Sequence, residues 1–128
     1  MRPICFIDDD SDDLELFATA LKESGCERPI IPFLDSSKLL EFLNTASPDS
    51  QPHLIITDLN MPLLDGKNLL HEIKNSSFSH IPVIVMSTTA REKDKKDLME
   101  LGARDFITKP SSYSQLMSLF TQLQQQWC

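Results

Sequence analysis

The chain contains 128 residues, which is enough for one domain and too few for two. Hydrophobic residues make up 41% and charged residues 24%, as is ordinary for a globular domain. Acidic residues outnumber basic residues by 19 to 12, and the net charge of −7 disfavours binding to the phosphates of DNA or RNA. No apolar stretch approaches the roughly 20 residues that span a bilayer, and the first one is too short for a signal peptide. We therefore expect a cytoplasmic protein that binds neither nucleic acid nor membrane.

The three cysteines, Cys5, Cys26 and Cys128, are odd in number and do not have the spacing of a zinc site. This pattern favours a reducing, intracellular compartment, in which disulfides are rare. We expect Cys5 to be a small core residue and Cys128 an exposed thiol, with no functional role for any of the three.

In chain order, short apolar runs alternate with longer amphipathic segments. Five short runs are predicted to be strands: Ile4–Ile7, Ile30–Leu34, Leu54–Thr57, Val83–Met86 and Asp105–Thr108. Each run precedes a stripe of apolar residues at helical spacing. The stripes are Leu14, Phe17 and Leu21; Leu39, Leu40, Phe42 and Leu43; Leu69, Leu70 and Ile73; Leu98 and Leu101; and Leu116, Leu119, Phe120, Leu123 and Trp127. This alternation predicts one α/β domain over residues 1–128, with a parallel sheet, right-handed crossovers and helices on both faces.

The composition of the strands indicates their order in the sheet. The second strand contains Pro32, which cannot donate a hydrogen bond to a central ladder, and the fifth is polar at both ends. The first, third and fourth strands are almost purely apolar, as strands buried on both faces should be. The strand order 2-1-3-4-5 satisfies these constraints. A doubly wound sheet of this order has a ligand-binding crevice at the carboxyl ends of strands 1 and 3.

Polar residues that are able to carry chemistry follow these strands. They are Asp8, Asp9 and Asp10 after the first strand, Asp58 after the third, Ser87 and Thr88 after the fourth, and Lys109 after the fifth. Carboxylates that share one site repel each other unless a cation is present, and their oxygens suit Mg²⁺. A metal, a lysine and a hydroxyl around a carboxylate are typical of phosphoryl transfer.

The remaining acidic residues of this segment have a simpler interpretation. Asp10 or Ser11 can cap the first helix, and Asp12 and Asp13 are favourable near its positive end. We therefore assign Asp12 and Asp13 to the helix entry and leave the role of Asp10 open.

Four motifs combine these residues: Phe6–Asp10, Thr57–Gly66, Val83–Thr88 and Gly102–Pro110. In order and spacing they resemble the receiver domain of two-component response regulators, a CheY-like family, over essentially the whole chain. The resemblance implies a flavodoxin-like fold and a stand-alone receiver without an output domain. It also implies a role in phosphorelay signal transduction, and not in enzymatic turnover of an outside substrate.

The resemblance implies that Asp58 is the phosphoacceptor, which takes the phosphoryl group of a phosphohistidine. Asp9, Asp58 and the backbone carbonyl of Asn60 would ligate Mg²⁺, with Mn²⁺ as the alternative metal. Asp8 would act mainly through metal-bound water.

The family also implies roles for residues of the last two strands. Ser87 would donate a hydrogen bond to the phosphoryl group, and Lys109 would pair with that group. The bond between Lys109 and Pro110 would be cis. Phe106 occupies the aromatic switch position, and its ring would swing inward when Ser87 moves. Serine replaces the commoner threonine at position 87 and keeps the hydroxyl, whereas phenylalanine at position 106 offers no hydroxyl to a partner.

The implied partners are a sensor histidine kinase or a histidine phosphotransfer protein. The implied contact surface for a downstream target is the face formed by helix 4, strand 5 and helix 5.

Three alternatives remain open from the sequence. A haloacid-dehalogenase-type phosphatase also uses an aspartate nucleophile, but it carries Asp-x-Asp there and its acidic pair comes late in the chain. A flavodoxin-like nucleotide or flavin binder needs a phosphate-binding loop after strand 1, where this chain has aspartates. A receiver that has lost phosphorylation and acts only as an interaction module is the third alternative.

Overall fold

The computed structural model describes residues 1–62, 64–89 and 91–128, so Leu63, inside the motif 57–66, and Ala90 lie outside the described residues. The strands β1 (Ile4–Ile7), β2 (Ile30–Phe33), β3 (Leu54–Asp58), β4 (Val83–Ser87) and β5 (Asp105–Thr108) form a parallel sheet in the order β2-β1-β3-β4-β5. The helices are α1 (Ser11–Glu23), α2 (Ser36–Thr45), α3 (Gly66–Lys74), α4 (Glu92–Glu100) and α5 (Tyr113–Trp127), with a 3₁₀ turn η1 (Pro48–Ser50) after α2. Among the described residues, no helix combines the length and apolar character needed to cross a membrane. The predicted α/β fold and strand order are confirmed.

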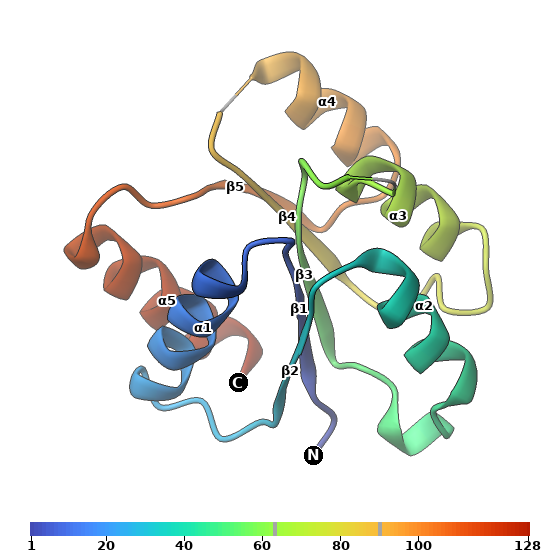
Figure 1. The fold of residues 1–128 in the computed structure, drawn as a ribbon, viewed down its shortest axis with the longest axis horizontal. Helices are drawn as coiled ribbons and strands as arrows, with labels where there is room; N and C mark the ends of the chain where they lie inside the picture. The colour runs from blue at the N-terminus through green and yellow to red at the C-terminus, as the bar shows by residue number, and fades with distance from the viewer. Residues whose placement is uncertain (63, 90) are drawn as a thin grey trace.

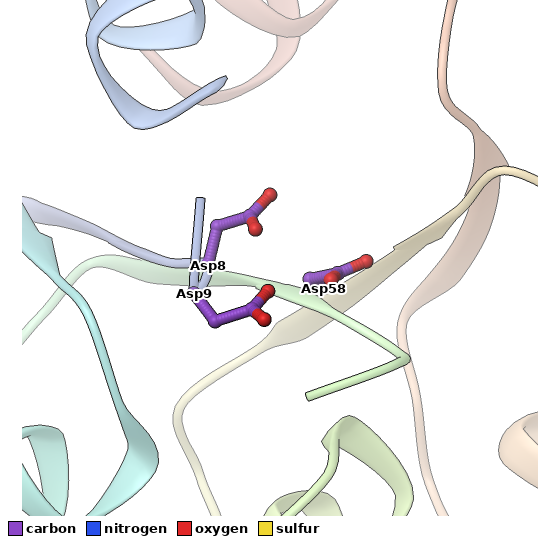
Figure 2. Close-up of side chains that lie close together, drawn as sticks. All are labelled: Asp8, Asp9 and Asp58. Atoms are coloured by element: carbon purple, nitrogen blue, oxygen red, sulfur yellow. The ribbon is translucent and has the colours of Figure 1, made fainter. Parts of the chain in front are cut away.

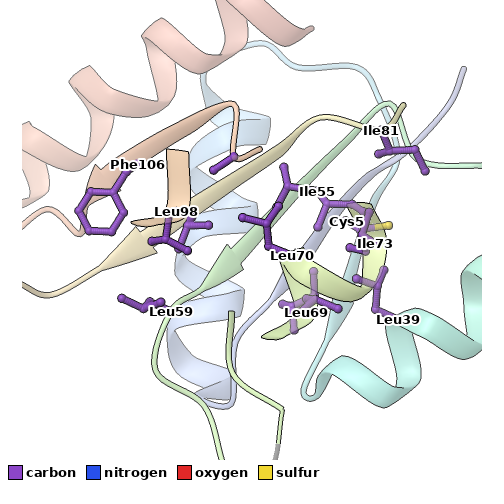
Figure 3. Close-up of a cluster of buried hydrophobic side chains, with 14 of the residues drawn as sticks. Cys5, Leu39, Ile55, Leu59, Leu69, Leu70, Ile73, Ile81, Leu98 and Phe106 are labelled. Atoms are coloured by element: carbon purple, nitrogen blue, oxygen red, sulfur yellow. The ribbon is translucent and has the colours of Figure 1, made fainter. Parts of the chain in front are cut away.

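Helices cover both faces of the sheet, with α1 and α5 on one side and α2, α3 and α4 on the other (Figure 1). Successive strand residues point to opposite faces, so each strand contributes to two cores. Phe6 of β1 packs with α1 and α5, where the Phe120 ring centroid lies 6.1 Å from that of Phe6 and 5.7 Å from that of Phe17. Cys5, the next residue to Phe6, lies in the opposite cluster with Leu69 of α3 (Figure 3).

Burial along the strands follows their positions in the sheet. Every residue of β1, β3 and β4 is buried, whereas the edge strands β2 and β5 are only partly buried. Pro32 is exposed on β2, where its missing N–H costs the sheet no central hydrogen bond. The prediction that β2 and β5 form the two edges is confirmed.

Two strands extend one residue further than predicted, and this difference concerns the polar residues. β3 includes Asp58, which pairs with Met86, and β4 includes Ser87, which pairs with Thr108. Asp58 and Ser87 are therefore the last residues of their strands, so the sheet itself fixes their backbone positions. β2 is one residue shorter than predicted, because Leu34 lies beyond its last pair.

Side-chain caps start four of the five helices. The carboxylates of Asp10, Asp35 and Asp65 and the hydroxyl of Ser112 accept hydrogen bonds from backbone N–H groups in the first turns of α1, α2, α3 and α5. Such caps satisfy N–H groups that have no partner inside the helix. Asp10 and not Ser11 caps α1, so the alternative left open in the sequence is settled.

The expectation of free thiols at Cys26 and Cys128 is wrong, because these residues form a disulfide. They are 102 residues apart in sequence, but α5 runs beside α1 and brings Cys128, the residue after α5, to the segment that follows α1. The same end of the chain is held by Arg28, whose Nε donates a hydrogen bond to the carbonyl of Trp127 at 3.0 Å. Cys5 is free and buried, as predicted.

Candidate functional site

Three carboxylates meet at the carboxyl end of the sheet. Oxygens of Asp8, Asp9 and Asp58 lie within 4.8 Å of one another, and the three side chains gather beside the ends of β1 and β3 (Figure 2). The neighbouring strands bring them together, since Ile7 pairs with Thr57 and the next residues are Asp8 and Asp58. Asp8 and Asp58 are buried, whereas Asp9 is exposed. The predicted acidic cluster is therefore present, with one side open to solvent.

Backbone hydrogen bonds hold the acidic strand ends in place. The Asp8 N–H donates to the Phe33 carbonyl at 3.1 Å, and the Asp8 Oδ1 accepts from the Asp10 N–H at 3.0 Å. Beyond Asp58, the Leu59 N–H donates to the Met86 carbonyl at 2.8 Å. These contacts order the backbone at both strand ends and the carboxylate of Asp8 before any ligand binds, which lowers the cost of forming a site.

Lys109 enters this cluster from the end of β5. Its Nζ lies 2.9 Å from Asp8 Oδ2 and 3.3 Å from Asp58 Oδ1, and the side chain is only 11% exposed. Its backbone N–H donates to the Ser87 carbonyl at 2.7 Å, which extends the β4–β5 contact beyond the strands. The Lys109 ammonium thus lies between the buried carboxylates of Asp8 and Asp58.

Burial and neighbouring charges shift the pKa values of Asp58 and Lys109. Burial raises the pKa of the Asp58 carboxyl, the charge of Asp8 raises it further, and Lys109 offsets part of this rise. Burial by itself lowers the pKa of the Lys109 ammonium, but the contacts with Asp8 and Asp58 outweigh it and raise that pKa. Lys109 is therefore protonated at neutral pH and compensates the crowded carboxylates.

Ser87 and Phe106 are both buried, Ser87 as the last residue of β4 and Phe106 within β5. Ser87 is fully buried at the end of β4, and its Oγ accepts a hydrogen bond from the Thr89 N–H at 3.2 Å. Phe106 of β5 is buried in the same hydrophobic cluster as Leu98 of α4 (Figure 3). The ring therefore already lies inside the protein in this structure.

The expected cis bond between Lys109 and Pro110 is not present, because this peptide bond is trans. A trans X–Pro bond is favoured by about 0.5–1 kcal/mol in the absence of other constraints. Here the trans bond still leaves the Lys109 ammonium in contact with Asp8 and Asp58.

Asp13 contributes to the site, although the sequence analysis assigned it only to the helix entry. Its Oδ2 accepts a hydrogen bond from Lys109 Nζ at 3.3 Å. The sequence signal for this contact is weak, because the two residues are 96 positions apart and Asp12 satisfies the same helix preference. Only the rotation of α1 relative to β5 decides which of the two carboxylates reaches the lysine.

A groove of about 530 Å³ opens beside Lys109. It runs between the start of α1 and the segment that joins β5 to α5, and its lining includes Asp13, Phe17, Thr88 and Tyr113. The Lys109 Nζ also lies 5.9 Å from the centre of the Phe17 ring, on this side of the site. Lys109 thus contacts the acidic cluster and also lines the groove.

The comparisons with known proteins agree with this geometry. A family model described as the response regulator receiver domain matches residues 4–121. The response regulator Rcp1 of Synechocystis sp. is 30% identical over 130 residues, which cover 98% of this chain and 88% of Rcp1. The sensor histidine kinase TmoS of Ectopseudomonas mendocina is 31% identical over 123 residues, or 95% of this chain, and this chain spans only 12% of TmoS.

Solved structures give the same result for the fold. The Mn²⁺-bound form of Rcp1 has a TM-score of 0.86 with 29% identity, over 99% of this chain and 94% of that one. The phosphorylated cyanobacterial phytochrome response regulator RcpA has a TM-score of 0.87 with 30% identity, over 98% of this chain and 93% of that one.

Proposed function

This chain belongs to the response regulator receiver family, and we propose that it accepts a phosphoryl group on the carboxylate of Asp58. The observation that carries the proposal is the contact of the Lys109 ammonium, 3.3 Å from Asp58 Oδ1 and inside the acidic cluster. Receiver domains are signalling proteins, and phosphorelay signalling is the role that the family match supports.

In the proposed reaction an Asp58 oxygen attacks the phosphorus of a phosphohistidine. The bond from phosphorus to the histidine nitrogen breaks, its electron pair stays with the imidazole, and an aspartyl phosphate forms. Because the attacking group must be ionised, the positive charge of Lys109 assists by favouring the carboxylate form of Asp58. The Ser87 hydroxyl would donate to a phosphoryl oxygen, and Lys109 would pair with another.

A divalent metal fits the donor set of this chain, since three carboxylates with hard oxygen atoms lie within 4.8 Å of one another. Asp9, Asp58 and the Asn60 carbonyl would hold Mg²⁺, or Mn²⁺ as a substitute, and Asp8 would act through metal-bound water. When bound, the metal neutralises charge on the phosphoryl oxygens. The existence of an Mn²⁺-bound form of Rcp1 supports the binding of a divalent metal by this chain.

The proposed output is a change of protein contacts. A sensor histidine kinase or a histidine phosphotransfer protein would supply the phosphoryl group. The new charge on Asp58 would draw Ser87 toward it and repack Phe106, which changes the face formed by α4, β5 and α5 toward a target. The contact between β4 and β5 at Ser87 and Thr108 links the site to this face.

The proposal is tested by incubating the protein with acetyl phosphate and recording its intact mass. Wild type should gain the mass of one phosphoryl group only with Mg²⁺, and Asp58→Asn should gain none. Asp12→Asn is the matched control, because it removes an exposed carboxylate nearby and should be phosphorylated as wild type is. Phosphorylation of Asp58→Asn would overturn the proposal. So would a wild-type protein that neither gains mass nor is stabilised against heat by Mg²⁺ with beryllofluoride.

A further inference from the structure

We propose that Asp13 is a positioning residue that competes with Asp58 for the Lys109 ammonium, so that it slows phosphorylation and strengthens metal binding. The inference rests on the proposed function of Asp58 and concerns how readily that residue is phosphorylated.

The lysine contacts three carboxylates that are not equivalent. Lys109 Nζ lies 2.9 Å from Asp8 Oδ2 and 3.3 Å from both Asp13 Oδ2 and Asp58 Oδ1. One positive charge is therefore divided among three carboxylates, and Asp13 holds the ammonium at the same distance as Asp58 does. Asp13 thus pulls the ammonium toward α1, in opposition to Asp58.

The position of Asp13 distinguishes it from the other two carboxylates. Its side chain is 34% exposed, whereas those of Asp8 and Asp58 are 5% and 8% exposed. Its backbone N–H is held by the capping carboxylate of Asp10 at 3.3 Å, which orders the turn that carries it. Asp13 thus lies at the outer margin of the site, on the wall of the groove beside Lys109.

The preference for acidic residues at a helix start does not account for the contact with Lys109. Asp12 lies in the same turn and serves the helix equally well, but it is exposed. In the part of the chain that the structure describes, no hydrogen bond or ion pair of the Asp12 carboxylate is found. Asp13 alone of these two adds a further anion to the lysine.

Two effects of opposite sign follow. A lysine drawn toward Asp13 leaves Asp8 and Asp58 freer to bind a divalent cation. The same lysine is less available to a phosphoryl group on Asp58. Asp13 should therefore raise metal affinity and lower the rate of phosphorylation at saturating metal.

The experiment compares Asp13→Asn with Asp12→Asn, which removes the same charge from the same turn. Mg²⁺ binding is measured by calorimetry, and phosphorylation by phosphoramidate at saturating Mg²⁺ is followed by intact mass. Asp13→Asn should weaken Mg²⁺ binding about three-fold and accelerate phosphorylation about three-fold, as a partly exposed ion pair allows, while Asp12→Asn changes neither. Asp13→Glu should lie between Asp13→Asn and wild type.

The same variants made in Lys109→Ala protein test whether Asp13 changes Mg²⁺ affinity by its contact with Lys109. In Lys109→Ala protein, Asp13→Asn should change Mg²⁺ affinity no more than Asp12→Asn does. Three results would overturn the proposal. Asp13→Asn and Asp12→Asn could have equal effects in the wild-type background, or Asp13→Asn could decrease both the Mg²⁺ affinity and the phosphorylation rate. The third is that Asp13→Asn weakens Mg²⁺ binding as much in Lys109→Ala protein as in wild type. If wild type itself neither binds Mg²⁺ nor is phosphorylated, it is the proposed function that fails.

Discussion

Gly66, the first residue of α3, lies directly against the backbone of Asp58. A methyl group on Gly66 would come within 2.5 Å of the Asp58 carbonyl oxygen and 2.9 Å of the Leu59 Cα. The N–H of Gly66 also donates to the Leu59 carbonyl at 2.9 Å. The start of α3 is therefore packed on the segment that carries the proposed acceptor, and only glycine fits there.

Gly66→Ala should lower the free energy of unfolding by about 1–3 kcal/mol, because backbone atoms have to move to admit the methyl group. Urea unfolding measures this change. Lys67→Ala, at the next and exposed position, is the control and should cost less than about 0.5 kcal/mol. A Gly66→Ala protein as stable as wild type would show that the contact is easily relaxed.

Asp58→Asn should stabilise the metal-free protein at pH 7 by about 1 kcal/mol, the gain expected from relieving an unfavourable charge. The folded state raises the pKa of Asp58 above its ordinary value of 3.8, so ionisation of this group opposes folding. The penalty is absent below that value, grows as the pH rises from it toward the raised pKa, and is constant above the raised pKa. The difference in stability between the variant and wild type should therefore be small at pH 3.5 and larger at pH 7.

Thermal melts in the presence of a chelator, taken from pH 3.5 to pH 7, measure this difference. Asp12→Asn again serves as the control, since its carboxylate is exposed. A constant difference across the pH range would contradict the assigned cause, because the gain would then not depend on the charge of Asp58.

Ser87→Ala should slow phosphorylation by acetyl phosphate about ten-fold, which is the effect of losing one hydrogen bond to a charged group. Ser87→Thr keeps the hydroxyl and should restore most of the rate. The rate is followed by intact mass at saturating Mg²⁺. A rate for Ser87→Ala equal to that of wild type would exclude the Ser87 hydroxyl from the reaction.

Reduction of the disulfide between Cys26 and Cys128 should lower the free energy of unfolding by about 2–4 kcal/mol, because the bond closes a long loop in the unfolded chain. Urea unfolding with and without reductant measures the effect. The double variant Cys26→Ser with Cys128→Ser should be insensitive to reductant, which provides the control.

Alkylation of the native protein gives an independent check of the thiols. Burial raises the pKa of the Cys5 thiol to about 12, so Cys5 should not react while the protein is folded. Native wild type should therefore incorporate no label before reduction and two labels afterwards. Labelling of two thiols without reductant would show that the disulfide does not form.

The sheet and the central site could be predicted because both depend on local signals. Apolar runs locate the strands, Pro32 marks an edge, and the parallel sheet carries Asp8, Asp58 and Lys109 to one end. The contact from Lys109 to Asp13 could not be predicted, since it depends on how far α1 is rotated about its axis.

Long-range pairing was the second limit. The disulfide joins Cys26 to a residue 102 positions away, and the odd number of cysteines argued against any bond. The isomer of the bond before Pro110 was inferred from resemblance alone and was wrong, because nothing in the local sequence determines it.

The C-terminal end of α5 is held by a disulfide and a hydrogen bond, and this constrains how the helix can move. Cys128 is bonded to Cys26, and the Trp127 carbonyl accepts from Arg28, at the end of the sheet where both termini lie and away from the carboxylates (Figure 1). The first residue of the helix, Tyr113, follows Lys109 after only three residues. A shift of Lys109 would therefore reach α5 at the end opposite the disulfide, so the helix would tilt about its C-terminal turn without sliding along the sheet.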